Sequence, residues 1–283
     1  MNDTDAVILC GVAAGLALWL PGAWAEEKDR TVFLSVGTAD CAVLKTEQGA
    51  VLIDTGWSGS QAVRYAQGEG IAFHAVILTH ADGDHAGGLQ NVLENVPVGA
   101  VYVPKGMRWE GLETAYAVAQ EKKIPVVELT RGDKMTVGAY EFTVLSPTHV
   151  RAGEENADSL VLQADRGDTT LLMMGDVTAA EEAALALPDC DILKIPHHGS
   201  GTATSALLLD KTTPEDAVIS VGTPNRYGFP KEDVLQRLEE ANVSIWRTDE
   251  AGAVTVTFAE EGYTIKGYAP KTWMEKLFGV RGE

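Results

Sequence analysis

The chain has 283 residues, 45% of them hydrophobic, which is enough to bury the core of one α/β domain but leaves little room for two unrelated ones. Its 41 acidic and 22 basic residues give a formal net charge of -19. Because binding to a nucleic-acid backbone needs Lys and Arg to displace counterions, this charge argues against a long DNA substrate without excluding one.

The N-terminal segment has features of an export signal. The apolar run from Ala6 to Leu20 has the length of a signal-peptide core and is too short for a comfortable transmembrane helix. Ala23-Trp-Ala25 then has the small-x-small form of a cleavage site, but the first five residues are acidic where a signal is normally basic. We expect residues 1–25 to be a signal peptide or an uncleaved anchor, and the protein to be exported to the periplasm or outside the cell.

Residues 26–270 show strand-like and helical patterns in alternation. We expect strands at 31–36, 42–45, 51–54, 75–78, 101–103, 126–127, 134–137, 141–145, 160–164, 169–174, 191–195, 217–221, 244–246, 254–258 and 263–266. We expect helices at 60–67, 86–94, 112–122, 178–187, 203–209 and 234–241. The order gives two successive series, each with a meander and βα units, and predicts an α/β domain. Residues 271–283 form a C-terminal tail with the spacing of a short helix.

Four metal-capable side chains follow the strand expected at 75–78. His80, Asp82, Asp84 and His85 fall within six residues, where a loop can turn them toward one point. Neighbouring carboxylates repel each other unless a cation neutralises them, which favours a metal site. The plainer alternative is a solvated acidic turn in which an aspartate caps a helix.

Two other strand-like runs also end in ligand-type residues. Asp176 follows the apolar run 171–174, and the pair His197-His198 follows 191–196. In layered α/β folds, functional residues collect at strand ends, where loops vary on a rigid support. We therefore expect one site assembled from three strand ends.

The segment His80-Ala-Asp-Gly-Asp-His85 resembles the histidine-rich signature of metallo-β-lactamase-fold hydrolases, with Asp82 where most members have a second histidine. This replacement and four other segments are similar to the C-terminal domain of the ComEC-type competence DNA-uptake proteins: Asn156-Ala-Asp-Ser-Leu-Val161, Gly175-Asp176, Leu193-Lys-Ile-Pro-His-His-Gly-Ser200 and Asn225-Arg-Tyr-Gly-Phe-Pro230. The resemblance runs from about residue 31 to about residue 268 and implies a four-layer αββα sandwich.

The resemblance also implies two divalent metal ions that activate a water for hydrolysis. His80 and Asp82 would hold one ion, and Asp84 and His85 the other. Asp176 would bridge both ions and His197 would complete the second site. The exchange of an imidazole for a carboxylate at Asp82 shifts the preference from a strict zinc pair toward manganese, so we expect Zn or Mn.

The other site residues divide by expected role. Asp84, Asp176 and His198 are expected to be catalytic, with His198 either a further ligand or an acid or phosphate contact. Asp54 orients the metal loop in the resembled fold, although residue type alone fits a turn or cap before Gly56 equally well. The expected substrate-facing residues are Asn156, Ser159, Ser200, Asn225, Arg226 and Tyr227.

Two details of this set stay open. Arg226 can hold a phosphate oxygen or form a surface salt bridge. Phe229 stands where the resembled family usually has a histidine, so a substrate contact or proton donor is expected to be absent there.

These features predict an exported metal-dependent phosphodiesterase or nuclease that acts on DNA or another phosphodiester. The alternatives are hydrolysis of a lactone, thioester or other ester at the same site, and a degenerate binding module. We expect no integral membrane channel in this chain, and no protein partner is evident from the sequence. Cys41 and Cys190 either pair in a disulfide or remain two buried thiols.

Overall fold

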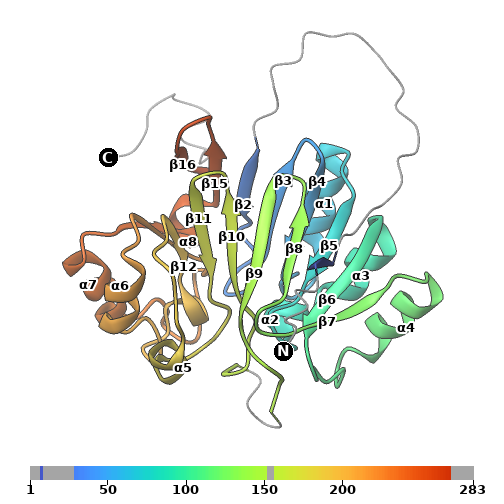
Figure 1. Cartoon of the computed structure of the whole chain (residues 1–283), viewed down its shortest axis with the longest axis horizontal. Helices are drawn as coiled ribbons and strands as arrows, with labels where there is room; N and C mark the ends of the chain where they lie inside the picture. Colours follow the sequence, from blue (N-terminus) through green and yellow to red (C-terminus); the bar gives the residue numbers. More distant parts are fainter. Residues whose placement is uncertain (1–6, 9–28, 152–155, 269–283) are drawn as a thin grey trace, which may run out of the picture.

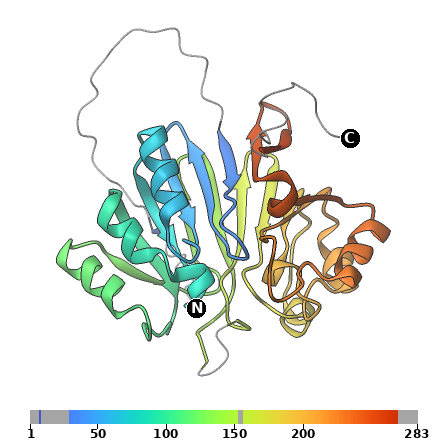
Figure 2. The same ribbon diagram turned by 180° about the vertical axis from the view of Figure 1, so that it is seen from behind.

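The computed structural model describes residues 7–8, 29–151 and 156–268. Within these residues, two eight-stranded mixed sheets pack face to face, and helices cover the outer face of each (Figures 1 and 2). The predicted four-layer αββα sandwich is confirmed. The expected leader, apart from residues 7–8, and the expected C-terminal tail lie outside the described residues. Among the described helices, none combines the length and hydrophobicity needed to span a membrane.

The first sheet has the strand order β16-β15-β2-β3-β4-β5-β6-β7. Its strands are β2 (Arg30–Phe33), β3 (Ala42–Thr46), β4 (Gly49–Ile53), β5 (Phe73–Ile77), β6 (Val98–Pro104), β7 (Val126–Leu129), β15 (Ala253–Phe258) and β16 (Tyr263–Tyr268). Strands β4 to β7 run parallel, and the others pair antiparallel. The helices of this half are α1 (Ser60–Glu69), α2 (Gly83–Ala86), α3 (Leu89–Asn95) and α4 (Glu113–Glu121).

The second sheet has the order β1-β8-β9-β10-β11-β12-β13-β14. Its strands are β1 (Val7–Ile8), β8 (Lys134–Val137), β9 (Tyr140–Ser146), β10 (Val161–Arg166), β11 (Thr169–Met173), β12 (Ile192–Lys194), β13 (Asp216–Ile219) and β14 (Ser244–Arg247). Strands β11 to β14 run parallel. The helices of this half are α5 (Ala179–Ala184), the 3-10 turn η1 (Pro196–Gly199), α6 (Ala206–Thr212), α7 (Glu232–Glu240) and α8 (Thr248–Ala251).

The alternation of side chains along each strand builds the layers. On β4, Val51 and Ile53 pack between the sheets, whereas Ala50 and Leu52 pack under the outer helices. A third core cluster lies between the second sheet and its helices α6 and α7. Cys41 and Cys190 belong to the two separate outer clusters, and both are free and buried.

The helix expected at 86–94 begins later, as α3 at Leu89, and the short helix α2 precedes it at Gly83–Ala86. Gly88 lies against the loop before α1, and a Cβ at this position would come within 2.1 Å of the Gly59 nitrogen. This close approach requires glycine and separates the ligand-bearing turn α2 from the longer helix α3. The loops after β4, β5, β11 and β12 then meet at one edge of the two sheets.

We expect Leu44→Ala to destabilise the protein by about 3 kcal/mol, because Leu44 is fully buried between the sheets and its loss leaves a cavity. Chemical denaturation of the variant and of the parent protein measures the difference. Leu207→Ala is the matched control, since Leu207 is 45% exposed on α6 and its truncation should cost less than about 0.5 kcal/mol. Equal losses in the two variants would contradict the assignment of Leu44 to the core.

Candidate metal centre

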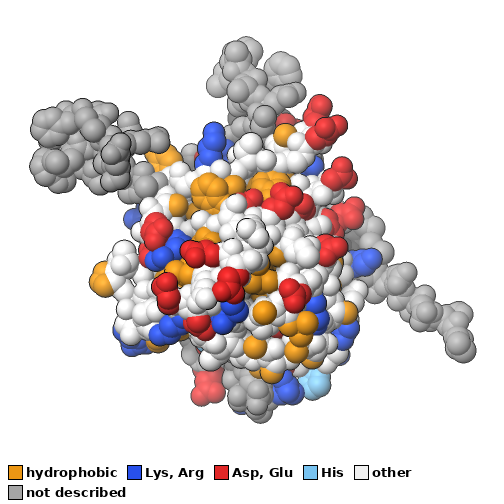
Figure 3. All heavy atoms as spheres, turned by 90° about the vertical axis from the view of Figure 1, so that its left-hand side faces the viewer, with side chains coloured by type: hydrophobic (Ala, Val, Ile, Leu, Met, Phe, Trp, Pro, Cys, Tyr) orange, Lys and Arg blue, Asp and Glu red, His pale blue; other side chains and the backbone are white. Residues whose placement is uncertain are grey.

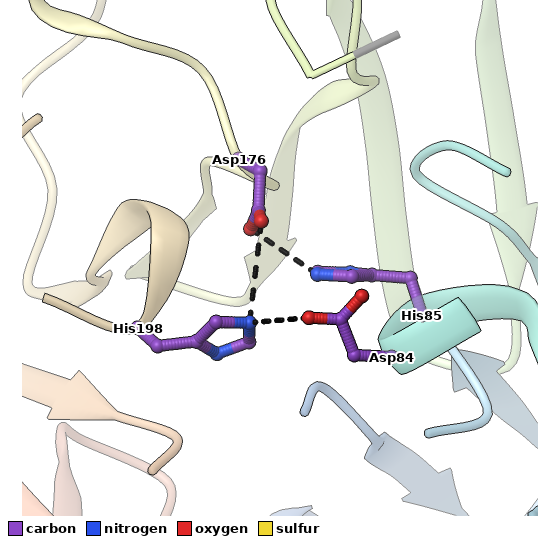
Figure 4. A group of neighbouring side chains, drawn as sticks. All are labelled: Asp84, His85, Asp176 and His198. Atoms are coloured by element: carbon purple, nitrogen blue, oxygen red, sulfur yellow. Dashed lines mark hydrogen bonds and ion pairs between the residues drawn. The ribbon is translucent and has the colours of Figure 1, made fainter. Parts of the chain in front are cut away.

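Four of the expected site residues form one compact group. Asp84 and His85 lie on α2, Asp176 lies in the loop after β11, and His198 lies on the turn η1 (Figure 4). One ligand atom from each side chain lies within 4.8 Å of the others. The three strand ends predicted from the sequence therefore meet at a single group of His and Asp side chains.

A hydrogen-bonded shell behind this group orients His85. Asp54 Oδ2 lies 2.7 Å from His85 Nδ1. The backbone N–H and the hydroxyl of Thr79 both donate to Asp54, each at 2.8 Å. Asp54 therefore holds His85 from behind, and Nε2 of the same ring faces Asp176 Oδ1 at 3.2 Å.

Two other imidazoles are also held through Nδ1. His198 Nδ1 donates to the carbonyl oxygen of Ser220 at 2.9 Å. His80 Nδ1 lies 3.0 Å from the Thr79 hydroxyl, which gives its own proton to Asp54, so the ring nitrogen is the donor. In His80 and His198, as in His85, Nε2 is left to face the site.

Several buried polar atoms of the group have no hydrogen-bond partner within the described residues. They are Nε2 of His80, Nε2 of His85 and Oδ1 of Asp176. His85 Nε2 and Asp176 Oδ1 face each other at 3.2 Å as an ion pair, whereas His80 Nε2 has no partner at such a distance in the described part of the chain. Because an unpaired buried nitrogen or oxygen is costly, this arrangement fits a site built to hold a cation.

The pKa values in the metal-free protein follow from burial and charge. Burial, together with the neighbouring His85, lowers the pKa of His80 to about 3, so His80 is neutral near pH 7. Burial also lowers the pKa of His85, but the carboxylates of Asp176 and Asp54 outweigh it and raise the pKa well above its usual value. Burial raises the pKa of Asp176, but His85 and His198 outweigh it and hold the pKa well below the usual value.

The remaining predicted ligands lie around this group. Asp82 Oδ2 is 3.8 Å from His80 Nε2, and 46% of the Asp82 side chain is exposed. Nε2 of His197 and Nε2 of His198 lie at similar distances from Asp176 Oδ2, 3.9 and 4.0 Å, but only His198 is also within 3.3 Å of Asp84 Oδ2 and belongs to the compact group. The geometry favours His198 as a ligand of the compact group, and the ligand role of His197 stays a prediction.

An unusual backbone turn presents the two adjacent histidines. His197 and His198 have φ values of 49° and 53°, and Gly199 follows at 80°. Non-glycine residues rarely occupy this left-handed region, and such strain is concentrated at functional sites. A Cβ on Gly199 would lie 2.6 Å from the Cβ of Pro230, so a side chain is excluded there. The turn brings both imidazoles to the same cavity.

This cavity has a volume of about 270 Å³ and opens above the metal group. Its lining residues are Trp57, Asp82, Gly83, Asp84, Asn156, Asp176, His197, His198, Tyr227 and Phe229. Asn156 and Tyr227 thus lie where the sequence analysis expected substrate-facing residues. Trp57 was not among the predicted site residues.

The other predicted substrate-facing residues have different surroundings. Ser159 is buried, accepts a hydrogen bond from the Asp176 N–H and lies 3.4 Å from His80 Nδ1. Ser200 is buried, and its hydroxyl is hydrogen-bonded to the hydroxyl of Thr202. The Asn225 side chain donates hydrogen bonds to two carbonyl oxygens of its own loop, and the Arg226 guanidinium lies over the ring of Tyr227. The cavity lining within the described residues does not include these four side chains.

The structure also contains a buried ion pair behind His198 that was not predicted from the sequence. Lys194 Nζ lies 2.7 Å from Asp40 Oδ2, and Asp40 Oδ1 lies 3.5 Å from His198 Nδ1. Burial raises the pKa of Asp40, but Lys194 and His198 outweigh it and lower the pKa. A lysine inside the apolar run 191–196 was the available signal, since a buried lysine needs an acidic partner.

Comparison with known proteins supports this interpretation. A model of the metallo-beta-lactamase superfamily matches residues 34–223. ComE operon protein 3 of Bacillus subtilis (strain 168) is 31% identical over 248 residues, which cover 79% of this chain and 32% of that protein. Recombination protein 2 of Haemophilus influenzae is 30% identical over 261 residues, which cover 88% of this chain and 32% of that protein. The chain therefore spans about a third of the length of these relatives.

Solved structures show the same fold. Zn(2+)-bound PqqB from Methylobacterium extorquens superimposes with a TM-score of 0.52 at 14% identity, over 77% of this chain and 87% of that one. At this level of identity, the similarity concerns the fold alone.

We expect Asp54→Asn to weaken divalent-metal binding by about 10- to 100-fold, because the amide holds His85 less firmly and in a less defined tautomer. Calorimetric titration of the metal-free protein with Zn²⁺ and Mn²⁺ measures the affinity. Asp210→Asn, an exposed position on α6, is the control and should leave the affinity unchanged. An unchanged affinity in Asp54→Asn would show that Asp54 does not support the metal loop.

We expect the metal affinity to rise with pH between about pH 6 and pH 8, by up to about tenfold per unit. The raised pKa of His85 means that the metal-free ring carries a proton, which metal binding must release. The affinity therefore falls as acid restores this proton. Titration in buffers of different ionisation enthalpy counts the released protons, and the absence of proton release at pH 7 would contradict the assignment.

Proposed function

Because the chain belongs to the metallo-beta-lactamase superfamily and gathers a His/Asp group at its strand ends, we propose that it is a metal-dependent hydrolase that cleaves phosphodiester bonds. The observation that carries this proposal is the opening of the buried His/Asp group directly into the 270 Å³ cavity. No serine or cysteine lies among the described lining residues, so the site supports attack by water.

The residues present fit two divalent ions. The group of Asp84, His85, Asp176 and His198 would hold one ion, and His80 and Asp82 lie beside it for a second. Such ions would supply Lewis-acid chemistry, which would promote the ionisation of water and stabilise an anionic transition state. The mixture of carboxylates and imidazoles suits manganese as well as zinc.

The protein's own groups position the reactants. Asp84 lies on the cavity floor and can accept a hydrogen bond from the attacking water, while His198 Nε2 lies 3.3 Å from its Oδ2. His198 is fixed by its bond to the Ser220 carbonyl, so its position does not depend on substrate. Asn156 lines the same cavity and offers an amide to a phosphate oxygen.

The relatives support a phosphodiester rather than another ester. Recombination protein 2 of Haemophilus influenzae and Competence protein ComA of Neisseria gonorrhoeae carry names that refer to recombination and competence, although this chain spans only about a third of their length. The net charge of -19 favours a short or single-stranded substrate over a long duplex. On the face of the molecule shown in Figure 3, basic side chains are interspersed with acidic ones and do not form a continuous stripe.

We also propose that the enzyme acts outside the cytoplasm. The support is the apolar run at 6–20 and the small-x-small sequence at 23–25. Export would place the enzyme where DNA from outside the cell is encountered.

We expect the protein to hydrolyse bis-p-nitrophenyl phosphate and fluorescent single-stranded DNA in the presence of Mn²⁺ or Zn²⁺. Asp176→Ala should reduce both activities on the order of a thousandfold, because it removes a buried carboxylate from the centre of the metal group. Asp210→Ala, the same change at an exposed position on α6, should retain full activity.

Retention of metal without cleavage of either substrate would overturn the phosphodiesterase proposal. Lactones and thioesters would then be the next substrates to assay on the same preparation. If the protein binds no divalent metal and His80→Ala changes none of its measured properties, the chain would instead be a degenerate binding module.

A further inference from the structure

We propose that the aromatic residues of the cavity, Trp57, Tyr227 and Phe229, bind an unpaired nucleobase next to the scissile phosphodiester. The inference rests on the proposed phosphodiesterase function and deepens it, because it makes the substrate a single strand or a frayed end rather than a paired duplex. The three residues line the cavity that also contains the metal group, and they come from two distant loops of the chain.

Trp57 is fixed in place although 54% of its surface is exposed. Its indole N–H donates to the carbonyl oxygen of Thr38 at 3.1 Å. The ring packs on Gly83, where a Cβ would lie only 2.9 Å from the indole Cζ3. Gly83 stands between Asp82 and Asp84, so a large exposed aromatic surface is held directly beside the expected ligands. Such a surface favours contact with a ligand.

Tyr227 and Phe229 form the second aromatic surface. Their rings are stacked, with centroids 5.3 Å apart and planes inclined by 16°. The Phe229 ring also meets His197 edge-on at 5.9 Å, which connects the stack to the metal side of the cavity. The phenylalanine that replaces the expected histidine is therefore part of an aromatic surface.

Hydrogen bonds hold this loop in shape without a ligand. The Asn225 side chain donates to the carbonyl oxygens of Gly222 and Phe229 and accepts from the Phe229 N–H. Lys231 Nζ donates to the Tyr227 carbonyl and lies 5.4 Å from the Phe229 ring centroid. Because the loop is already ordered, little entropy is lost when a ring stacks against it.

Two cations lie on the stack. The Arg226 guanidinium is 4.8 Å from the Tyr227 ring centroid, and Lys231 lies over Phe229. Rings that bind bases and cations that attract phosphates are the two components of single-strand recognition. In this acidic chain, Tyr227 and Phe229 line the cavity, and the two cations lie over their rings.

An unpaired base fits the cavity more readily than a paired one. The volume of about 270 Å³ is large enough for a ring-bearing group. Inside a duplex, both faces of a base are covered by its neighbours, so a base must leave the stack before it can contact a protein ring. A strand end or an unpaired strand meets this requirement without the cost of unstacking.

The test compares Trp57→Ala with the parent on two fluorescent strands of equal length, one with normal bases and one with abasic tetrahydrofuran residues. Binding is measured by anisotropy in an Asp176→Ala background, which does not cleave, and KM and kcat are measured in the active protein. We expect Trp57→Ala to weaken binding of the normal strand and raise its KM about tenfold, with kcat within about twofold and abasic-strand binding unchanged. Trp57→Phe should restore most of the affinity.

Tyr116→Ala is the matched control, since Tyr116 is 39% exposed on α4 and does not line the cavity. Thermal unfolding verifies that each variant is folded. The proposal is overturned if Trp57→Ala affects the normal and abasic strands equally, or affects neither. If the parent cleaves bis-p-nitrophenyl phosphate in either of these cases, the phosphodiesterase function stands. A selective loss of base binding in a protein that cleaves no diester would support the aromatic site and overturn the function.

Discussion

The burial of acidic side chains at one edge of the sandwich constrains the rest of this structure. Asp40, Asp54 and Asp176 lie almost fully out of solvent, where an uncompensated negative charge is costly. Lys194 pairs with Asp40, and His85 lies between Asp54 and Asp176. The remaining unpaired atoms face one point, which a divalent cation would satisfy. The fold thus supports a binding site at some cost to its own stability.

The local backbone carries part of this cost. Gly175 has a φ of 55°, and a Cβ there would lie 2.7 Å from the Cβ of Ser159, so only glycine allows Asp176 to lie beside Ser159. The turn at residues 197–199 has three successive positive φ values. The paired strands β11 and β12 hold the N-terminal ends of these two loops, and the helices α5 and α6 follow them, so the strained geometry is supported on both sides.

Local signals in the sequence predicted the α/β class and three members of the metal group, Asp84, His85 and Asp176, because a strand followed at once by His or Asp is visible in the sequence itself. The four-layer arrangement was implied by the family resemblance. The choice between His197 and His198 depends on a left-handed turn that the sequence does not reveal. The Asp40–Lys194 pair joins residues 154 positions apart, and the bonds of Asn225 close its own loop, so their roles follow from tertiary packing. The break between α2 and α3 likewise follows from a tertiary contact, the close approach of Gly88 to Gly59.

In the proposed nuclease, chemistry and recognition would be carried by different residues, which would explain how so acidic a chain acts on a nucleic acid. There, the metal group would supply the reaction, and the rings of Trp57, Tyr227 and Phe229 would bind the strand beside it, together with the cations Arg226 and Lys231. Binding by base stacking depends less on a long basic surface than backbone binding does, and base stacking is lost when the strand is paired. In that enzyme, the net charge of -19 would disfavour a long duplex more than a single strand end.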